Sequence, residues 1–326
     1  MRSLPAAMVV AIAAQACVPP PRPLPPQPSD AAVGCIDTDG YADAMGSGHL
    51  FLVDEFGFAE LGKCLDRDGD GESDCAINRA WRPLLPVLNN MLVAAVSNGR
   101  ILMVFEVAGL CAPYDGADPA VTIKIYPATD ADPDPTNNLC LEPGCGQVLA
   151  RAKYMSDGQS LYRAPPQPVI EYRVRTAMGA DLAIDLEQAS EPMTIKELDM
   201  TCLLPEQMDE LSEGVLCGVA PVDNLALVRL PVCDYLPAFC QLALIPDDLN
   251  LAEYLVVLGQ QPDVDMDGDG LEEIELDTNN RTLLCYDGDG SVMGAKDCLH
   301  DPAMQDGYSV CFSFHGIPGA IVGIDD

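Results

Sequence analysis

The sequence predicts a mainly β protein: an antiparallel β-sandwich or barrel-like domain with a few short helices, preceded by a Cys- and Asp-rich segment. Three observations predict this class. Six or seven short segments have the apolar pattern of strands, turns rich in Asp, Pro and Gly separate them, and few segments have helical spacing. No repeat is evident apart from two acidic loops.

The expected strands are, in order, Ile101–Val107, Val121–Tyr126, Val169–Thr176, Leu182–Leu186, Met193–Leu203, Val215–Val219 and Gly307–Phe314. The last of them alternates most clearly. Tyr308, Val310, Phe312 and Phe314 are expected to face a core, because successive side chains of a strand point to opposite faces. A C-terminal strand of this quality is expected to join a sheet built earlier in the chain.

Helical spacing is clearest after Pro83, where apolar residues recur from Leu84 to Val96 until Asn98 and Gly99 end the pattern. Proline is favoured at a helix start, and glycine just past a helix end. Shorter helices are expected near Pro205–Leu211, Leu225–Leu230 and Asp248–Leu258.

The N-terminus, residues 1–16, has the pattern of a signal peptide: Arg2, a short apolar run, and Ala14-Gln15-Ala16 as a small-x-small cleavage site. Cleavage after Ala16 would leave Cys17 first, as in a lipoprotein, although Ala14 and Gln15 depart from the usual lipoprotein pattern. Two interpretations stay open, a lipid anchor on Cys17 or simple secretion. The chain is therefore expected to be exported, as an outer-membrane or cell-surface lipoprotein or as a secreted protein.

Beyond the signal peptide we expect a Pro-rich tether over 17–33, a Cys- and Asp-rich calcium-loop segment over 34–78, and a β-rich domain over 79–326 with a calcium loop inserted near 263–290. Fourteen Cys in an exported chain predict disulfides. Cys64 and Cys75 bracket the first acidic loop, and a bridge between them would curl it in advance.

The charge balance restricts the partners of the chain. With 51 acidic and 17 basic residues, the formal net charge is −34. Nucleic acids and anionic lipid surfaces should repel such a chain. Nucleic-acid binding is therefore excluded, and cations or neutral partners are favoured.

Two loops share the pattern Asp-x-Asp-Gly-Asp-Gly-x-x-(Asp/Glu), at 66–74 and 265–273. Carboxylates at every second position can converge on one centre only where the backbone curls tightly, which the glycines permit. Ca²⁺ takes this set of oxygen ligands and removes their mutual repulsion. The expected ligands are Asp66, Asp68, Asp70, Asp74, Asp265, Asp267, Asp269 and Glu273. Asp263 also permits a shifted register in the second loop.

Neither loop is an EF-hand, because Ile77 and Leu276 occupy the twelfth position where a Glu is needed. The loops instead resemble thrombospondin type 3 repeats over about nine residues each, and Cys75 directly follows the first. That resemblance implies a structural calcium ion. A third segment, Cys285–Gly290, is either a turn or an accessory site, and Cys285 and Cys298 could form a bridge around it.

No catalytic motif is evident, and the chain is not expected to be an enzyme. Among its acids, Glu106 stands out within an apolar strand, as either a catalytic carboxylate or a structural one. We expect a non-catalytic, calcium-binding bacterial surface protein with a role in adhesion or recognition, whose layout resembles cell-envelope lipoproteins. The alternative is an extracellular hydrolase or carbohydrate-binding module with structural calcium. Whether the ligand is protein or carbohydrate stays open, and a purely structural envelope protein is a third interpretation.

Overall fold

The fold is described from a computed structural model of the chain. The residues that the structure describes are 48–66, 73–83, 85–110, 114–131, 139, 147–156, 159–178, 181–184, 190–229, 249–266, 274–277, 282–286, 292–293 and 306–325. The signal peptide, the Pro-rich tether and Cys17 lie outside them.

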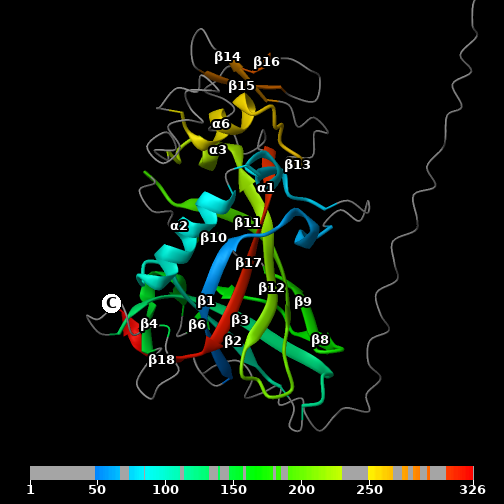
Figure 1. Cartoon of the computed structure of the whole chain (residues 1–326), viewed down its shortest axis with the longest axis vertical. Helices are drawn as coiled ribbons and strands as arrows, with labels where there is room; N and C mark the ends of the chain where they lie inside the picture. Colours follow the sequence, from blue (N-terminus) through cyan, green and yellow to red (C-terminus); the bar gives the residue numbers. More distant parts are fainter. Residues whose placement is uncertain are drawn as a thin grey trace, which may run out of the picture.

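Eight antiparallel strands close into a barrel, which confirms the predicted fold class (Figure 1). Each strand pairs with the next barrel strand along the chain, and the last pairs with the first, so the barrel has an up-and-down topology. In order around the barrel the strands are β1 His49–Phe58, β2 Leu102–Ala108, β3 Asp118–Asp130, β8 Gln167–Ile170, β9 Arg173–Ala177, β11 Met193–Leu203, β12 Leu211–Pro221 and β17 Asp306–Pro318.

Further strands extend this sheet. β4 (Gln147–Arg151) pairs with β3, and β18 (Ala320–Asp325) runs parallel to β4. β7 (Tyr162–Arg163) pairs with β3, β10 (Leu182–Ile184) with β11, and β13 (Val264–Asp265) with β17. Two small sheets stand apart, made of β5 Met155–Ser156 with β6 Gln159–Ser160, and of β14 Ile274–Asp277, β15 Thr282–Tyr286 and β16 Val292–Met293.

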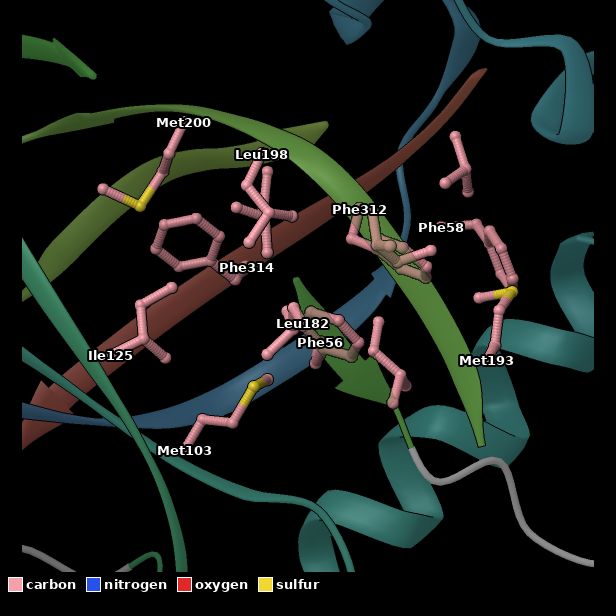
Figure 2. Close-up of a cluster of buried hydrophobic side chains, with 14 of the residues drawn as sticks. Phe56, Phe58, Met103, Ile125, Leu182, Met193, Leu198, Met200, Phe312 and Phe314 are labelled. Atoms are coloured by element: carbon pink, nitrogen blue, oxygen red, sulfur yellow. The ribbon is translucent and has the colours of Figure 1, made fainter. Parts of the chain in front are cut away.

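Side chains fill the barrel, as Figure 2 shows. Six of the seven Phe residues of the chain belong to this core: Phe51, Phe56, Phe58, Phe105, Phe312 and Phe314. The rings of Phe56 and Phe312 stack with their centroids 5.0 Å apart, and those of Phe105 and Phe314 lie 4.5 Å apart. These six phenylalanines all lie on three neighbouring strands, β1, β2 and β17.

The alternation predicted for the C-terminal strand is confirmed. Tyr308, Val310, Phe312 and Phe314 are all buried in the main core, and Ser309, Cys311 and Ser313 occupy the alternate positions of β17. β17 lies between β1 and β12 and closes the barrel. A strand near the C-terminus therefore pairs with β1, the first strand of the barrel.

Strand β1 was not predicted, although it lies within the 34–78 segment and pairs with β2 and β17. A β-bulge between Val53 and Glu55 interrupts its alternation, so that Phe51 and Val53 before the bulge and Phe56 and Phe58 after it all reach the core. The bulge hides the period-2 pattern in the sequence.

The predicted helix after Pro83 is confirmed as α2 (Leu85–Ser97), which packs on β1, and the last predicted helix as α6 (Leu251–Val257). Asn250 and Glu253 form a capping box at the start of α6. Gly99, at φ +69°, donates its N–H to the carbonyl of Val96 and ends α2.

Two helix predictions need correction. Pro205–Leu211 contains a turn and the first residue of β12, because Met208 donates its N–H back to the Pro205 carbonyl at a positive φ. The helix expected at Leu225–Leu230 lies earlier, as α3 (Val222–Leu225). A further short helix, α1 (Ala76–Ala80), follows the first acidic loop, and two 3₁₀ turns are η2 (Leu61–Lys63) and η3 (Ala152–Tyr154).

The segments between β12 and β17 gather beyond one end of the barrel. Figure 1 shows α3, α6 and the β14–β16 sheet together at this end, near the start of β17. Their apolar side chains, including Leu255, Ile274 and Leu283, continue the barrel core. Within the described part of the chain, no helix is long and apolar enough to cross a membrane.

Candidate functional site

The first acidic loop leaves and rejoins the folded protein at a narrow neck. Asp74 donates its N–H to the carbonyl of Leu65 over 3.0 Å, and a disulfide joins Cys64 to Cys75. The predicted bridge across this loop is therefore present. Of the predicted ligands, Asp66 and Asp74 are described, and Asp68 and Asp70 lie outside the described residues.

The second acidic loop starts from β13, which pairs with the beginning of β17. Asp265 is opposite Asp306 in this pairing. The remaining predicted ligands, Asp267, Asp269 and Glu273, lie outside the described residues. The same is true of most of the Cys285–Gly290 segment and of Cys298, so the third candidate site is not described.

Asp263, two residues before the second loop, is bound to β17 through both carboxylate oxygens. Its Oδ1 accepts the N–H of Ser309 over 2.7 Å, and its Oδ2 accepts the Ser309 hydroxyl. Its own N–H donates to the carbonyl of Gly307. Both carboxylate oxygens of Asp263 are therefore already bound to β17.

The same serine also holds the flank of the first loop. The Ser309 hydroxyl oxygen accepts the N–H of Ala76 over 2.8 Å, and Ala76 directly follows Cys75. Ser309 is fully buried. Two loops about 200 residues apart in the sequence are thus attached to one side chain, and α1 and β13 both lie near the same end of β17 in Figure 1.

Asn78 strengthens this attachment. Its amide nitrogen donates to the carbonyls of Ala59 and Cys311 over 2.9 and 2.8 Å, and its amide oxygen accepts the N–H of Cys311. The residue is completely buried. The amide therefore joins α1 to β17 and to the end of β1, and it fixes where the first loop returns to the barrel.

The electrostatics of this end reflect crowded negative charge. Burial raises the pKa of the Asp263 carboxyl above its usual range, and the Ser309 hydrogen bonds oppose that shift. The carboxylate of Asp74 raises the pKa further, whereas the guanidinium of Arg79 lowers it slightly. The charge of Asp74, the last predicted ligand of the first loop, thus raises the pKa of Asp263, which lies two residues before the second loop.

The three described ligand candidates, Asp66, Asp74 and Asp265, do not by themselves form a metal centre. Within the described ranges, the group of potential ligand atoms that converges to within 4.8 Å is made of sulfurs, those of Cys64, Cys75 and Cys311. All three are in disulfides, because Cys217 of β12 is bonded to Cys311 of β17. The carboxylates that could complete each calcium loop belong to its central residues.

Glu106 has the character of a structural carboxylate. It is fully buried on β2, where its Oε2 accepts the hydroxyl of Tyr126 over 2.7 Å and lies 3.2 Å from the Lys124 ammonium. Its Oε1 accepts the N–H of Gly48. Burial alone would raise the Glu106 pKa, but the Tyr126, Gly48 and Lys124 interactions lower it below its ordinary value.

The opposite shift occurs at Tyr126. Burial, and then the hydrogen bond to Glu106 and the charge of that carboxylate, raise the pKa of the tyrosine hydroxyl far above its usual range. Register explains the cluster, because Glu106 pairs with Lys124 across β2 and β3. The three residues form a closed network in which the acid stays ionised and the phenol stays neutral.

A groove with a volume of about 910 Å³ lies on the outer face of the barrel. Its floor includes Gly57, Ser313, Val215 and Thr201, which follow one another across β1, β17, β12 and β11 in register. Side chains of α2 and of the 61–66 segment line its walls. Sequence reasoning missed it, because its residues come from seven separate segments.

His315 lies at the edge of this groove and bridges two acids. Its Nδ1 is 2.7 Å from Asp54 Oδ1, and its Nε2 is 3.4 Å from Glu210 Oε2. Partial burial lowers the pKa of the imidazole, but the hydrogen bond and charge of Asp54, together with those of Glu210, raise it above its ordinary value overall. This histidine therefore acts as a titratable cation between β17, β1 and the β11–β12 turn.

Comparison with known proteins supplies no relative for this chain. No protein-family model, no curated protein and no solved structure matches it. The features of the chain that bear on its function are therefore the sequence pattern of the acidic loops and the attachment of these loops to the barrel.

Proposed function

We propose that the chain is an exported, non-catalytic, calcium-binding protein in which calcium stabilises two acidic loops at one end of the barrel. The observation that supports this most is the shared attachment of both loops to Ser309 of β17. Two loops rich in carboxylates, rooted on one side chain, concentrate negative charge that a hard divalent cation would offset.

Calcium here has the role of a structural ion. The loops leave the barrel at points already closed by a disulfide and by strand pairing, so the ion would rigidify them rather than trigger a large rearrangement. Extracellular sites of this kind bind calcium with a Kd of about 10⁻⁴–10⁻³ M. Calcium at millimolar concentrations outside the cell would keep such sites largely filled.

Isothermal titration calorimetry tests the proposal. We expect about two calcium ions per chain, and about one after Asp66→Ala or after Asp265→Ala, because each substitution removes a ligand from one loop. Asp223→Ala, which removes an acidic side chain in α3 outside both loops, is the matched control and should leave the stoichiometry unchanged. Equal binding by all four proteins would rule out the assigned ligands.

The surface location is a separate part of the proposal. A lipid on Cys17, followed by the Pro-rich segment at 17–33, would hold the barrel at a distance from a membrane. Mass spectrometry of the mature N-terminus decides between the two forms of export. An acylated Cys17 supports a surface lipoprotein, an unmodified mature N-terminus supports secretion, and an uncleaved Met1 contradicts both.

The groove supports a second candidate function, the binding of a small ligand, as in a carbohydrate-binding module or hydrolase. Its volume of about 910 Å³ lies in the range of small-molecule sites. Its lining carries both signs of charge, with Lys63 and Arg173 beside Glu55 and Glu213. If a glycan or metabolite binds here, Val93→Trp in α2 should abolish that binding without affecting calcium stoichiometry.

A further inference from the structure

Two disulfides lie in contact on the outer face of the barrel. Cys64–Cys75 closes the first acidic loop, and Cys217–Cys311 joins the neighbouring strands β12 and β17. All four residues belong to one buried cluster, together with Ala59 and Val215. The sulfurs of Cys64, Cys75 and Cys311 lie within 4.8 Å of one another.

This arrangement places a potential nucleophile next to a disulfide of the barrel wall. Thiol–disulfide exchange requires a thiolate that can reach one sulfur of an existing bond, and the other sulfur then leaves as a thiolate. If the bond between Cys64 and Cys75 opens, either thiolate is within reach of Cys311 Sγ, and Cys217 is the leaving group.

We propose that these four cysteines form a disulfide-exchange site that can transfer the tether of the first acidic loop onto the barrel strand β17. The inference does not depend on calcium binding, because no metal takes part in the exchange. It assigns a chemical reactivity to a cluster that would otherwise have only a structural role.

The reaction balances in two steps. A dithiol reductant attacks the Cys64–Cys75 bond, is itself oxidised to a disulfide, and leaves Cys64 and Cys75 reduced. The Cys75 thiolate, having lost its proton to solvent, then attacks Cys311 Sγ, so that Cys75–Cys311 forms, Cys217–Cys311 breaks, and the Cys217 thiolate takes up a proton. The second step changes partners without net oxidation.

Exposure identifies the point of first attack. The exposed fraction of Cys64 is 9%, compared with 1% for Cys75 and Cys217 and 0% for Cys311. A reductant therefore reaches Cys64 first, which makes Cys75 the leaving thiolate and the residue placed to attack Cys311. The reductant thus opens Cys64–Cys75, and the Cys75 thiolate that is released then attacks Cys217–Cys311.

Exchange would alter the surface around the loop. In the Cys75–Cys311 form, α1 would be bonded directly to β17, and Cys64 would lose its covalent link. Lys63 and Leu65, on either side of Cys64, contribute to one wall of the groove. Reduction would therefore loosen this wall while the end of the first loop stays attached to the barrel.

Cys64→Ser tests the proposal without an added reductant, because it leaves Cys75 as a thiol beside the intact Cys217–Cys311 bond. The folded variant is quenched in acid, unfolded and alkylated at that pH, digested with pepsin and mapped by mass spectrometry. We expect the Cys75–Cys311 linkage, with alkylated Cys217, to exceed every other new pairing by about tenfold, because neighbouring sulfurs held in place react as an intramolecular pair.

Cys217→Ser is the matched variant, since it leaves Cys311 as the thiol beside the intact Cys64–Cys75 bond. We expect linkage of Cys311 to Cys64 or to Cys75. Cys202 provides an internal control. It is buried and free in the structure, burial raises the pKa of its thiol to about 12, and it should take part in none of the new linkages.

A third arm uses the unaltered chain with less than one equivalent of dithiothreitol, so the result does not depend on either variant folding. The Cys75–Cys311 or Cys64–Cys311 linkage should appear among the partly reduced molecules. The proposal is overturned if Cys75 is fully alkylated and Cys217–Cys311 intact in Cys64→Ser, and if Cys311 is fully alkylated and Cys64–Cys75 intact in Cys217→Ser. It is also overturned if the new linkages form only in denaturant.

Discussion

Two carboxylates that contact the barrel, the fully buried Glu106 and the more exposed Asp263, are stabilised in different ways. Glu106 lies 3.2 Å from the Lys124 ammonium and accepts the hydroxyl of Tyr126, so its charge is offset inside the protein. Asp263 accepts hydrogen bonds from the uncharged Ser309, and the charge of Asp74 acts on it. Glu106 is paired with a cation, whereas Asp263 is held by neutral donors and is acted on by both Asp74 and Arg79.

The two carboxylates show two ways in which negative charge is stabilised in a chain with a net charge of −34. In the middle of the barrel wall a lysine provides the counter-charge, and register places it opposite the acid. At the end of β17 the carboxylate of Asp263 accepts hydrogen bonds from the neutral Ser309, and the charges of Asp74 and Arg79 both act on it. A cation from solution is the simplest way to offset that charge, and its binding would then contribute to stability.

The largest effect is expected when the network of Glu106, Lys124 and Tyr126 is broken. Lys124→Met removes the cation and leaves the buried Glu106 charge uncompensated, which should lower the free energy of unfolding by about 3–5 kcal/mol. Denaturant unfolding measures the loss. The double variant Glu106→Gln/Lys124→Met should recover part of it, and a single variant as stable as the unaltered chain would show that Lys124 does not compensate Glu106.

An intermediate effect is expected at the hydrogen bonds of Ser309. Ser309→Ala removes the hydroxyl that joins Ala76 to Asp263, and should cost about 1–3 kcal/mol because the buried N–H of Ala76 loses its hydrogen-bond acceptor. The loss should depend on calcium if the loops bind it, unlike the loss caused by Lys124→Met. Ser313→Ala, at a less enclosed position of the same strand face, is the control and should change stability little.

The smallest expected effect concerns His315, which loses its positive charge as pH rises. The pKa of His315 is raised in the folded state, so its ion pairs stabilise the fold fully below the unfolded pKa of about 6.5. That contribution is lost as pH rises through the folded pKa. His315→Gln should remove a pH-dependent stabilisation of about 0.5–1 kcal/mol, and unchanged pH dependence of unfolding would contradict the assignment.

Local sequence patterns predicted much of the fold. The alternation of Tyr308–Phe314 and the helical spacing before Gly99 each depend on a few consecutive residues, and both are found as expected. Strand β1 was missed for a local reason as well, since its bulge at Asp54 shifts the apolar side chains out of strict alternation. Pro205–Leu211 was assigned wrongly, because a turn can share the composition of a short helix.

The candidate site could be predicted only in part. The acidic loops and the Cys64–Cys75 bridge follow from short-range spacing. The meeting of both loops at Ser309 requires a strand more than 200 residues after the first loop to pair beside β1, and no local pattern in the sequence reveals that pairing. For the same reason the contact of Cys311 with the loop disulfide could not be foreseen.

The most direct measurement is the free energy of unfolding with about 5 mM calcium and with chelator, at matched ionic strength. For a Kd of about 10⁻⁴–10⁻³ M, calcium should stabilise the unaltered chain by about 1–2 kcal/mol per loop. The double variant Asp66→Ala/Asp265→Ala should gain almost nothing, and Lys124→Met should keep the full gain. Identical unfolding of the unaltered chain in calcium and in chelator would contradict the claim that calcium offsets the charge at β17.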